Sequence, residues 1–294
     1  VSYKTMDTQE LLKKVRRIEI KTRRLSNHIF SGEYHSSFKG RGMAFSEVRK
    51  YAAGDDIRAI DWNVSAKLNE PYIKVFEEER ELTLMLLVDV SGSGDFGTQV
   101  QLKREMITEI CATLAFSAIQ NNDKVGVIFF SDRVEKFIPP AKGKTHTLRI
   151  IRELIDFQPQ SRKTNIAEAL RFFTSFQKRR AIAFVLSDFR DLNYRDALQI
   201  MSRKHDVTGI QIFDEREREL PALGIIPMKD PETGQIAWVN TSSAKIQQRV
   251  RQRFAQHQKY FVQSFTKSGA GQLSINVNES YAKQLLGYFK KRSA

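Results

Sequence analysis

Between residues 82 and 213 the chain alternates between short apolar runs and segments with a helical apolar period. The runs are long enough for buried strands and too short for buried helices. The segments between them place apolar residues three or four positions apart, as amphipathic helices do. The predicted elements are strands 82–89, 124–130, 134–138, 181–187 and 206–213, and helices 98–121, 145–156, 165–178 and 194–204. This alternation predicts a Rossmann-like α/β domain with a mostly parallel central sheet and helices on both faces.

The ends of the chain follow other patterns. An amphipathic helix is predicted at 7–24, followed by extended runs at 42–50 and 71–77. After residue 213 the pattern predicts a hairpin near 221–240, helix 243–267, strand 272–277 and helix 279–291. We therefore divide the chain into an N-terminal helical and extended segment, 1–80, and an α/β domain, 81–294, which ends in basic helices.

Small oxygen-bearing side chains follow the first predicted strand of the α/β domain. The run LMLLVDVSGS ends in Asp89, and Ser91 and Ser93 come next at alternate positions. If the backbone stays extended there, alternation sends all three side chains the same way. Oxygen ligands at the carboxyl end of a sheet strand are suited to a hard cation.

Two later residues supply further oxygen ligands. Thr164 lies in a polar loop before a helical pattern, and Asp188 ends the apolar run AIAFVLSD. We predict that Asp89, Ser91, Ser93, Thr164 and Asp188 meet on one rim of the sheet and bind Mg²⁺ or Mn²⁺.

Two other interpretations compete with this metal site. Asp89 could cap the turn that follows it, with the serines bonded to the backbone. A haloacid-dehalogenase-like phosphatase also has an apolar strand that ends in Asp. That chemistry needs a second carboxylate two residues later, where this chain has Ser91, and a hydroxyl does not act as a general acid at neutral pH. The phosphatase interpretation is therefore disfavoured.

The pattern D-x-S-x-S, followed by a distant Thr and a distant Asp, resembles the metal-ion-dependent adhesion site of von Willebrand factor A domains. The segment GDDIRAIDWNVSAKLNEPYIKVFEEERE and the adjoining LLVDVSGS resemble the domain-of-unknown-function-58 family, over roughly residues 30–215. The resemblance implies a von Willebrand A-like domain behind a family-specific N-terminal segment. It also implies metal ligation by Asp89 and Asp188, directly or through water, and work beside MoxR-type AAA+ ATPases.

The GDDIRAIDW segment has its own physical interpretation. Acidic and basic residues alternate there beside apolar anchors, namely Asp55, Asp56, Arg58, Asp61 and Trp62. We expect an ion-pair and aromatic clasp that holds the N-terminal segment to the sheet domain. A partner-binding surface is the alternative.

Charge and composition narrow the function classes. The net charge is +14, with +7 in residues 1–54, +9 in residues 241–294 and −2 in between. Basic ends could bind nucleic acid, but they also suit solvated faces of amphipathic helices, and no nucleic-acid-binding motif accompanies them. With no 18-residue apolar run and no leader pattern, we expect a cytoplasmic protein without membrane insertion.

The expected function is a non-enzymatic, cation-dependent protein-interaction module. Neutral ligands leave the cation short of negative charge, so it would attract a carboxylate from a partner that presents Asp or Glu. A metal-dependent hydrolase is the alternative, with Arg162 and Lys163 holding a phosphate. A basic nucleic-acid scaffold is the third possibility.

Overall fold

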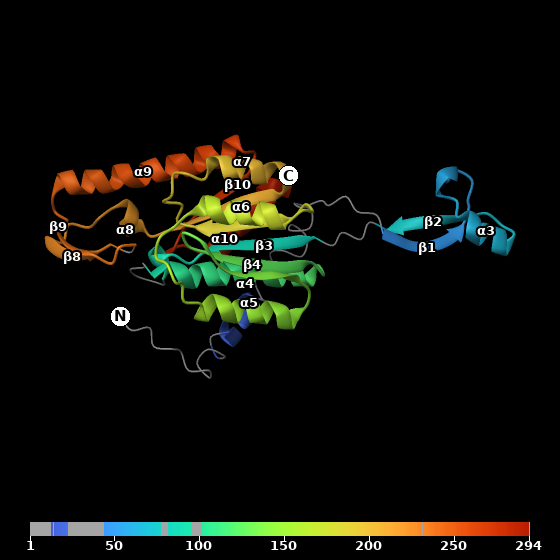
Figure 1. The fold of residues 1–294 in the computed structure, drawn as a ribbon, viewed down its shortest axis with the longest axis horizontal. Helices are drawn as coiled ribbons and strands as arrows, with labels where there is room; N and C mark the ends of the chain where they lie inside the picture. Colours follow the sequence, from blue (N-terminus) through green and yellow to red (C-terminus); the bar gives the residue numbers. More distant parts are fainter. Residues whose placement is uncertain are drawn as a thin grey trace. The chain divides into compact units, whose positions relative to one another are not determined.

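The computed structural model describes residues 13, 15–22, 44–77, 82–95, 102–230 and 232–293. The chain forms two compact units: residues 38–82 make one, and residues 1–37 with 83–294 make the other, which we call the sheet unit. Figure 1 shows the fold coloured along the sequence.

The sheet unit is built on a six-stranded sheet with the order β10-β7-β6-β3-β4-β5. All neighbouring strands are parallel except β4 and β5, which are antiparallel. The strands are β3 (Thr83–Asp89), β4 (Lys124–Phe130), β5 (Val134–Ala141), β6 (Ile182–Ser187), β7 (Asp206–Phe213) and β10 (Gly271–Asn276). Every residue of β6, and every residue of β3 after Thr83, is buried, as expected for central parallel strands.

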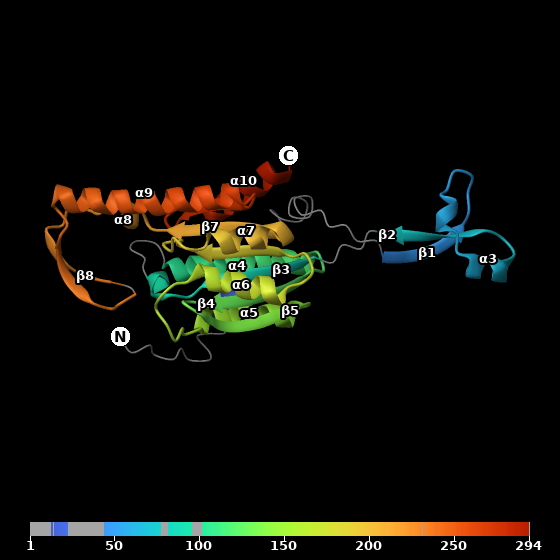
Figure 2. The same cartoon turned by 45° about the horizontal axis from the view of Figure 1, so that its top comes forward.

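Helices cover both faces of this sheet (Figures 1 and 2). One face packs against α6, α7 and α9, and the other against α4, α5 and α10. The helices are α4 (Lys103–Gln120), α5 (Lys144–Asp156), α6 (Ile166–Phe176), α7 (Arg195–Lys204), α9 (Ala244–Lys267) and α10 (Tyr281–Ser293). The predicted α/β class with a mostly parallel, doubly covered sheet is confirmed. No helix in the described ranges is both long and apolar enough to cross a membrane.

An aromatic cluster joins α9 to the sheet. The rings of Phe189 and Phe261 lie 4.4 Å apart, and those of Phe261 and Phe265 lie 4.8 Å apart. Gly209 of β7 makes room for this cluster, because a Cβ atom there would lie 2.4 Å from the Phe265 ring. The close approach of α9 to the sheet therefore depends on a residue without a side chain.

The strand β5 is longer than predicted. The expectation that it ends at Pro139 and Pro140 was wrong, because the strand continues through both to Ala141. β5 is the edge strand of the sheet, and its pairing with β4 shifts register between Ile138 and Ala141. Consecutive residues of a strand point their backbone nitrogens to opposite sides, so only one of the two prolines faces the outer edge. The register shift spans both, so the strand accommodates the other without a ladder hydrogen bond to β4.

The predicted N-terminal helix is present over its described residues, 13 and 15–22; the rest of the 7–24 prediction lies outside the described residues. Val15 packs with Ala112, Phe116 and Ile151, from α4 and α5. This helix therefore belongs to the sheet unit, whereas the sequence placed it with the extended segment in 1–80.

The smaller unit contains a two-stranded antiparallel sheet, β1 (Ala44–Lys50) and β2 (Tyr72–Glu77), at the predicted extended runs. Between these strands lie a short 3₁₀ helix, η1 (Ile57–Ala59), and the helix α3 (Trp62–Leu68), neither of which was predicted.

After β7 the chain forms the short helix α8 (Glu215–Arg218) and then the predicted hairpin. The hairpin strands are β8 (Ile225–Lys229) and β9 (Ile236–Asn240), which pair antiparallel. The helix α9 follows and runs back along the sheet.

Candidate functional site

The candidate site lies where the strand order of the sheet reverses. β3 and β6 are neighbours at the centre, and the chain winds outward from them in opposite directions. Crevices that bind ligands form at the carboxyl ends of strands at such a switch point. Asp89 ends β3, and Asp188 follows the last residue of β6. The predicted carboxylates thus lie at the position where the fold opens.

The backbone after β3 turns tightly around Asp89. The amide of Ser91 donates to Asp89 Oδ1 at 2.9 Å, and Ser187 Oγ donates to Asp89 Oδ2 at 2.6 Å. The chain then enters a 3₁₀ turn, η2 (Gly92–Asp95). Within it Ser93 Oγ lies 3.2 Å from Ser91 Oγ, and both serines are buried. Asp89 therefore does cap the turn that follows it, and the same turn gathers the two hydroxyls beside the carboxylate.

Asp188 lies in a buried network of charges. Lys103 Nζ donates to Asp188 Oδ2 at 3.0 Å and to Glu217 Oε1 at 2.7 Å. Arg190 contacts the same two carboxylates, at 3.3 Å from Asp188 and 2.7 Å from Glu217. The Lys103 side chain is only 2% exposed. Two cations and two carboxylates thus join the end of β6 to α4 and α8.

The two site carboxylates differ in electrostatic environment. Burial, and then the negative charge of Asp188, raises the pKa of Asp89 above its ordinary value. Burial also acts to raise the pKa of Asp188, but the charges of Lys103 and Arg190 and a hydrogen bond from Ser93 hold it below its ordinary value. In the described ranges no basic side chain forms an ion pair with Asp89. Asp89 is thus the site carboxylate without an ion-pair partner among the described residues.

The structure brings four of the five predicted ligands into one hydrogen-bonded group; Thr164 is not joined to them. Thr164 is half-buried, and no hydrogen bond in the described ranges connects it to the other four. Its loop is nevertheless tied to the site, because Gly92 N donates to Arg162 O at 3.0 Å. The next residue, Asn165, accepts from Glu168 N and so caps α6. Thr164 therefore sits on a loop anchored beside the serine turn.

Lys103, Arg190 and Glu217 were missed by the sequence interpretation. Lys103 precedes Met106 and Ile110 on the buried stripe of α4, so its helical spacing was a signal for a buried charge. Glu217 gave no such signal, because the four-residue helix ERER has no apolar period.

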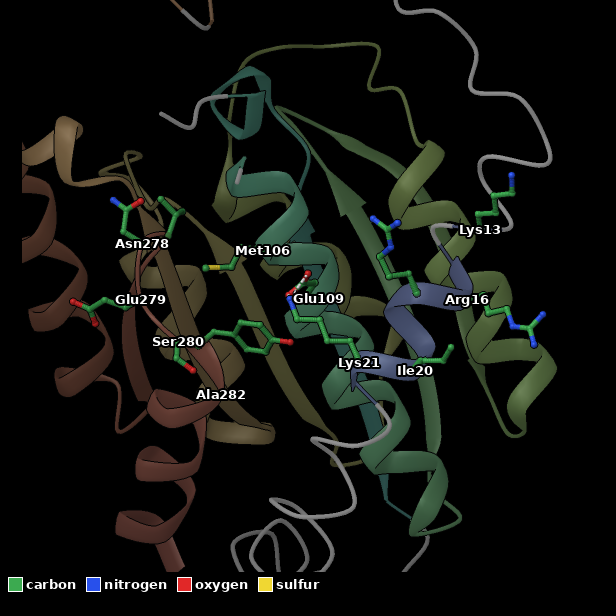
Figure 3. Close-up of a pocket in the computed structure, with 13 residues that line it drawn as sticks. Lys13, Arg16, Ile20, Lys21, Met106, Glu109, Asn278, Glu279, Ser280 and Ala282 are labelled. Atoms are coloured by element: carbon green, nitrogen blue, oxygen red, sulfur yellow. Dashed lines mark hydrogen bonds and ion pairs between the residues drawn. The ribbon is translucent and has the colours of Figure 1, made fainter. Parts of the chain in front are cut away.

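A small cavity of about 80 Å³ adjoins Asp89 and Ser91, and Arg104 and Arg162 also line it. A larger hollow of about 940 Å³ lies elsewhere, between residues 13–21, α4 and residues 277–282. Figure 3 shows Lys21 in contact with Glu109 in this hollow. We assign the site to the smaller cavity, because none of the predicted ligands lines the larger one.

The GDDIRAIDW residues make local contacts within the smaller unit. Asp55 accepts two hydrogen bonds from Arg49, at 2.7 and 2.8 Å. Asp56 caps η1 by accepting from Arg58 N, and Asp61 caps α3. Trp62 is 68% exposed. The clasp to the sheet domain stays a prediction.

Comparison with known proteins gives both relatives and solved structures. An uncharacterized protein of Mycobacterium tuberculosis (strain H37Rv) is 24% identical over 290 residues, which cover 98% of this chain and 91% of the relative. An aerotolerance-related membrane protein from Bacteroides fragilis is 17% identical, with a TM-score of 0.47, covering 72% of this chain and 98% of that chain. The SpRpn10 VWA domain is 12% identical, with a TM-score of 0.38, and the match covers 70% of this chain and 94% of that domain's chain.

The family model described as "Protein of unknown function DUF58" matches residues 47–260, which is more than half of the chain. This match runs from the strand β1 through the candidate site to α9, and so includes both units. The predicted family is confirmed: the chain belongs to the DUF58 family.

Proposed function

We propose that the protein is a non-enzymatic, divalent-cation-dependent protein-interaction module. The observation that carries this proposal is the buried group of Asp89, Ser91, Ser93 and Asp188 at the switch point of the sheet. All four offer hard oxygen ligands, the kind that Mg²⁺ and Mn²⁺ prefer. Asp89 lacks a basic partner in the described ranges, so a bound cation would supply the missing positive charge.

The residues present are suited to a hydrated ion. Asp89, Ser91 and Ser93 would hold Mg²⁺ or Mn²⁺ from the β3 side, and Asp188 and Thr164 would act directly or through water. The cavity of about 80 Å³ beside Asp89 has room for an ion with a few waters, which Mg²⁺ normally retains. Among the described residues, Lys103 and Arg190 balance the charges of Asp188 and Glu217, so Asp89 supplies the unbalanced negative charge of the site.

This charge balance determines the kind of partner. A divalent ion held by one unpaired carboxylate and neutral hydroxyls keeps net positive charge. A carboxylate from another protein would complete its coordination without being buried unpaired, which is otherwise costly. We therefore propose a cytoplasmic partner that presents Asp or Glu, and the family resemblance points to a MoxR-type AAA+ ATPase.

The test measures the cation and the partner together. Purified MoxR-type ATPase should be retained by the wild-type protein in Mg²⁺ and lost in EDTA, and Asp89→Ala should lose retention in both. Asp132→Asn is the matched control, because Asp132 follows β4 at the same edge of the sheet and none of the four grouped side chains contacts it. Retention that survives in Asp89→Ala would refute the proposal.

A metal-dependent hydrolase is the second candidate, because Arg162 lines the same cavity as Asp89. Its guanidinium and the neighbouring Lys163 could hold a phosphate group. Mg²⁺-dependent turnover of p-nitrophenyl phosphate, abolished by Asp188→Asn and weakened by Arg162→Ala, would favour this candidate over the interaction module.

A further inference from the structure

The β8–β9 hairpin carries an exposed apolar face. Pro227 of β8 pairs with Trp238 of β9. Side chains two residues apart on a strand point to the same side, so Ile225 and Ile236 lie on the same side of the hairpin as Pro227 and Trp238. Ile225 is 66% exposed, Ile236 67% and Trp238 73%. We call Ile225, Pro227, Ile236 and Trp238 the hairpin face. Contiguous exposed apolar side chains of this size are typical of interaction sites.

The hairpin is held in a defined shape at its base and at its turn. At the base, buried Thr241 donates to Gly224 O through its amide at 2.8 Å and through Oγ1 at 2.9 Å. At the turn, Asp230 Oδ1 accepts from the amides of Glu232 and Thr233. The hairpin face is thus presented by a braced element.

The hairpin also lies beside the candidate metal site. It follows α8, whose Glu217 contacts the Asp188 network, and both lie at the end of the sheet unit where β7 finishes (Figures 1 and 2). The carboxylates of Asp230 and Glu232 in its turn are near enough to act electrostatically on Arg190, which contacts Asp188 at 3.3 Å. A partner that reaches the metal site would therefore meet the hairpin.

The surrounding charge indicates an acidic partner. The helix α9, which begins just after the hairpin, carries six basic residues and no acidic one: Lys245, Arg249, Arg251, Arg253, Lys259 and Lys267. Four of these, namely Lys245, Arg249, Arg251 and Arg253, lie in the first ten residues of α9, next to the hairpin, and Lys229 is exposed at the end of β8. Charge complementarity therefore favours a segment with Asp or Glu near apolar residues.

A protein is favoured over a lipid surface as this partner. β8 and β9 pair only with each other within the described residues, so each has an outer edge with free N–H and C=O groups. A protein strand can bond to these groups, whereas hydrocarbon cannot.

We propose that the hairpin face docks an acidic protein segment, whose apolar side chains pack on Trp238 while its Asp or Glu enters the neighbouring metal site. The second half of this statement rests on the proposed function; the docking on Trp238 does not. Large aromatic side chains dominate the energy of most interfaces, so Trp238 should be the main contributor.

The test selects ligands from a display library of random twelve-residue peptides, using the full protein in Mg²⁺. Selected peptides should contain Asp or Glu flanked by apolar residues. Their affinity should fall at least about tenfold for Trp238→Ala, as expected for an interface hot spot. Ile200→Ala is the matched control, because Ile200 is also an exposed apolar residue but lies on α7, outside the hairpin; it should change affinity less than twofold.

The outcomes separate the two proposals. Peptides that need Asp89 and Mg²⁺ but not Trp238 would overturn the docking surface and leave the metal site supported. Peptides that need Trp238 but bind equally in EDTA would support the docking surface and refute the metal site. Failure to select any peptide that depends on Trp238 would overturn the docking surface. So would Trp238-dependent sedimentation with phosphatidylserine vesicles, or Trp238-dependent self-association.

Discussion

The ammonium of Lys103 lies 3.0 Å from the carboxylate of Asp188, and both side chains are almost completely buried. Asp89, on the neighbouring strand, has only hydroxyl and amide partners among the described residues. One of the two site carboxylates is thus neutralised by the chain, and the other has no ion-pair partner among the described residues.

The first prediction concerns Lys103. Lys103→Met should lower the free energy of unfolding by about 3–5 kcal/mol, because it leaves Asp188 and Glu217 buried with one cation fewer. It should also tighten Mg²⁺ binding, since a positive charge is removed beside the site. Urea unfolding with and without Mg²⁺ measures both effects, and added Mg²⁺ should restore more stability to the variant than to the wild type.

The matched control for Lys103→Met is Lys136→Met. Lys136 lies 2.7 Å from Glu153, but both side chains are partly exposed, so this pair should contribute less than about 1 kcal/mol. Equal losses for the two variants would contradict the importance of burial at Lys103.

The second prediction concerns the charge of Asp89. Its pKa is raised in the folded state, so the folded protein binds a proton more tightly than the unfolded chain does. Ionised Asp89 therefore lowers stability as the pH rises through its folded pKa. In EDTA at pH 7.5, Asp89→Asn should raise the free energy of unfolding by roughly 1–3 kcal/mol, as measured by urea unfolding. Adding Mg²⁺ should stabilise the wild type and leave the variant unchanged; stabilisation of both would argue against Asp89 as a ligand.

The third prediction concerns acid stability. His205 is buried against Phe173, with 4.7 Å between the rings, and in the described ranges neither ring nitrogen has a hydrogen-bond partner. Its pKa is lowered to about 4. Burial is the largest cause, and the positive charges of Lys204 and Arg180 also lower the pKa. The unfolded chain then binds more protons than the folded one between pH 6.5 and about 4, so stability falls as the pH drops through that window.

His205→Phe removes this titration. Thermal unfolding measured between pH 6.5 and 4.5 should show a smaller loss of stability in His205→Phe than in the wild type, by up to about 3 kcal/mol. Parallel pH profiles for the two proteins would show that His205 does not contribute.

The fourth prediction compares two glycines. Gly209→Ala places a Cβ within 2.5 Å of the Phe265 ring, so α9 must shift, at a cost of about 1–3 kcal/mol. Gly287→Ala in α10 meets nothing within 4 Å and should stabilise the protein by about 0.5–1 kcal/mol through helix propensity. Urea unfolding of both variants tests this, and equal effects would refute the close packing of α9.

Much of the fold could be predicted because its core strands are continuous apolar runs. β4 and β7 have the bounds that the sequence predicted, and β3 and β6 differ by one residue at their starts. Elements without an apolar period, such as α8, gave no signal. The two prolines of β5 suggested an end, but the edge position of the strand and its register shift accommodate them.

For the candidate site, the sequence predicted the oxygen-bearing side chains but not the charged residues around them. Asp89, Ser91 and Ser93 are close in the sequence, and Asp188 follows another buried run, so topology alone brings them together. The buried Lys103 lies 85 residues from its partner Asp188, and Glu217 a further 29 residues along the chain. Charge pairing over such separations depends on tertiary packing that local patterns do not encode.

The strand pair β1–β2 brings Ala44 opposite Glu77, so the described part of the smaller unit starts and finishes at adjacent points of the backbone. A segment with adjoining ends can be lengthened, exchanged or excised without stretching the chain on either side. The smaller unit therefore has the geometry of a cassette, and its replacement would exchange the exposed apolar residues Ile57, Trp62 and Leu68 together.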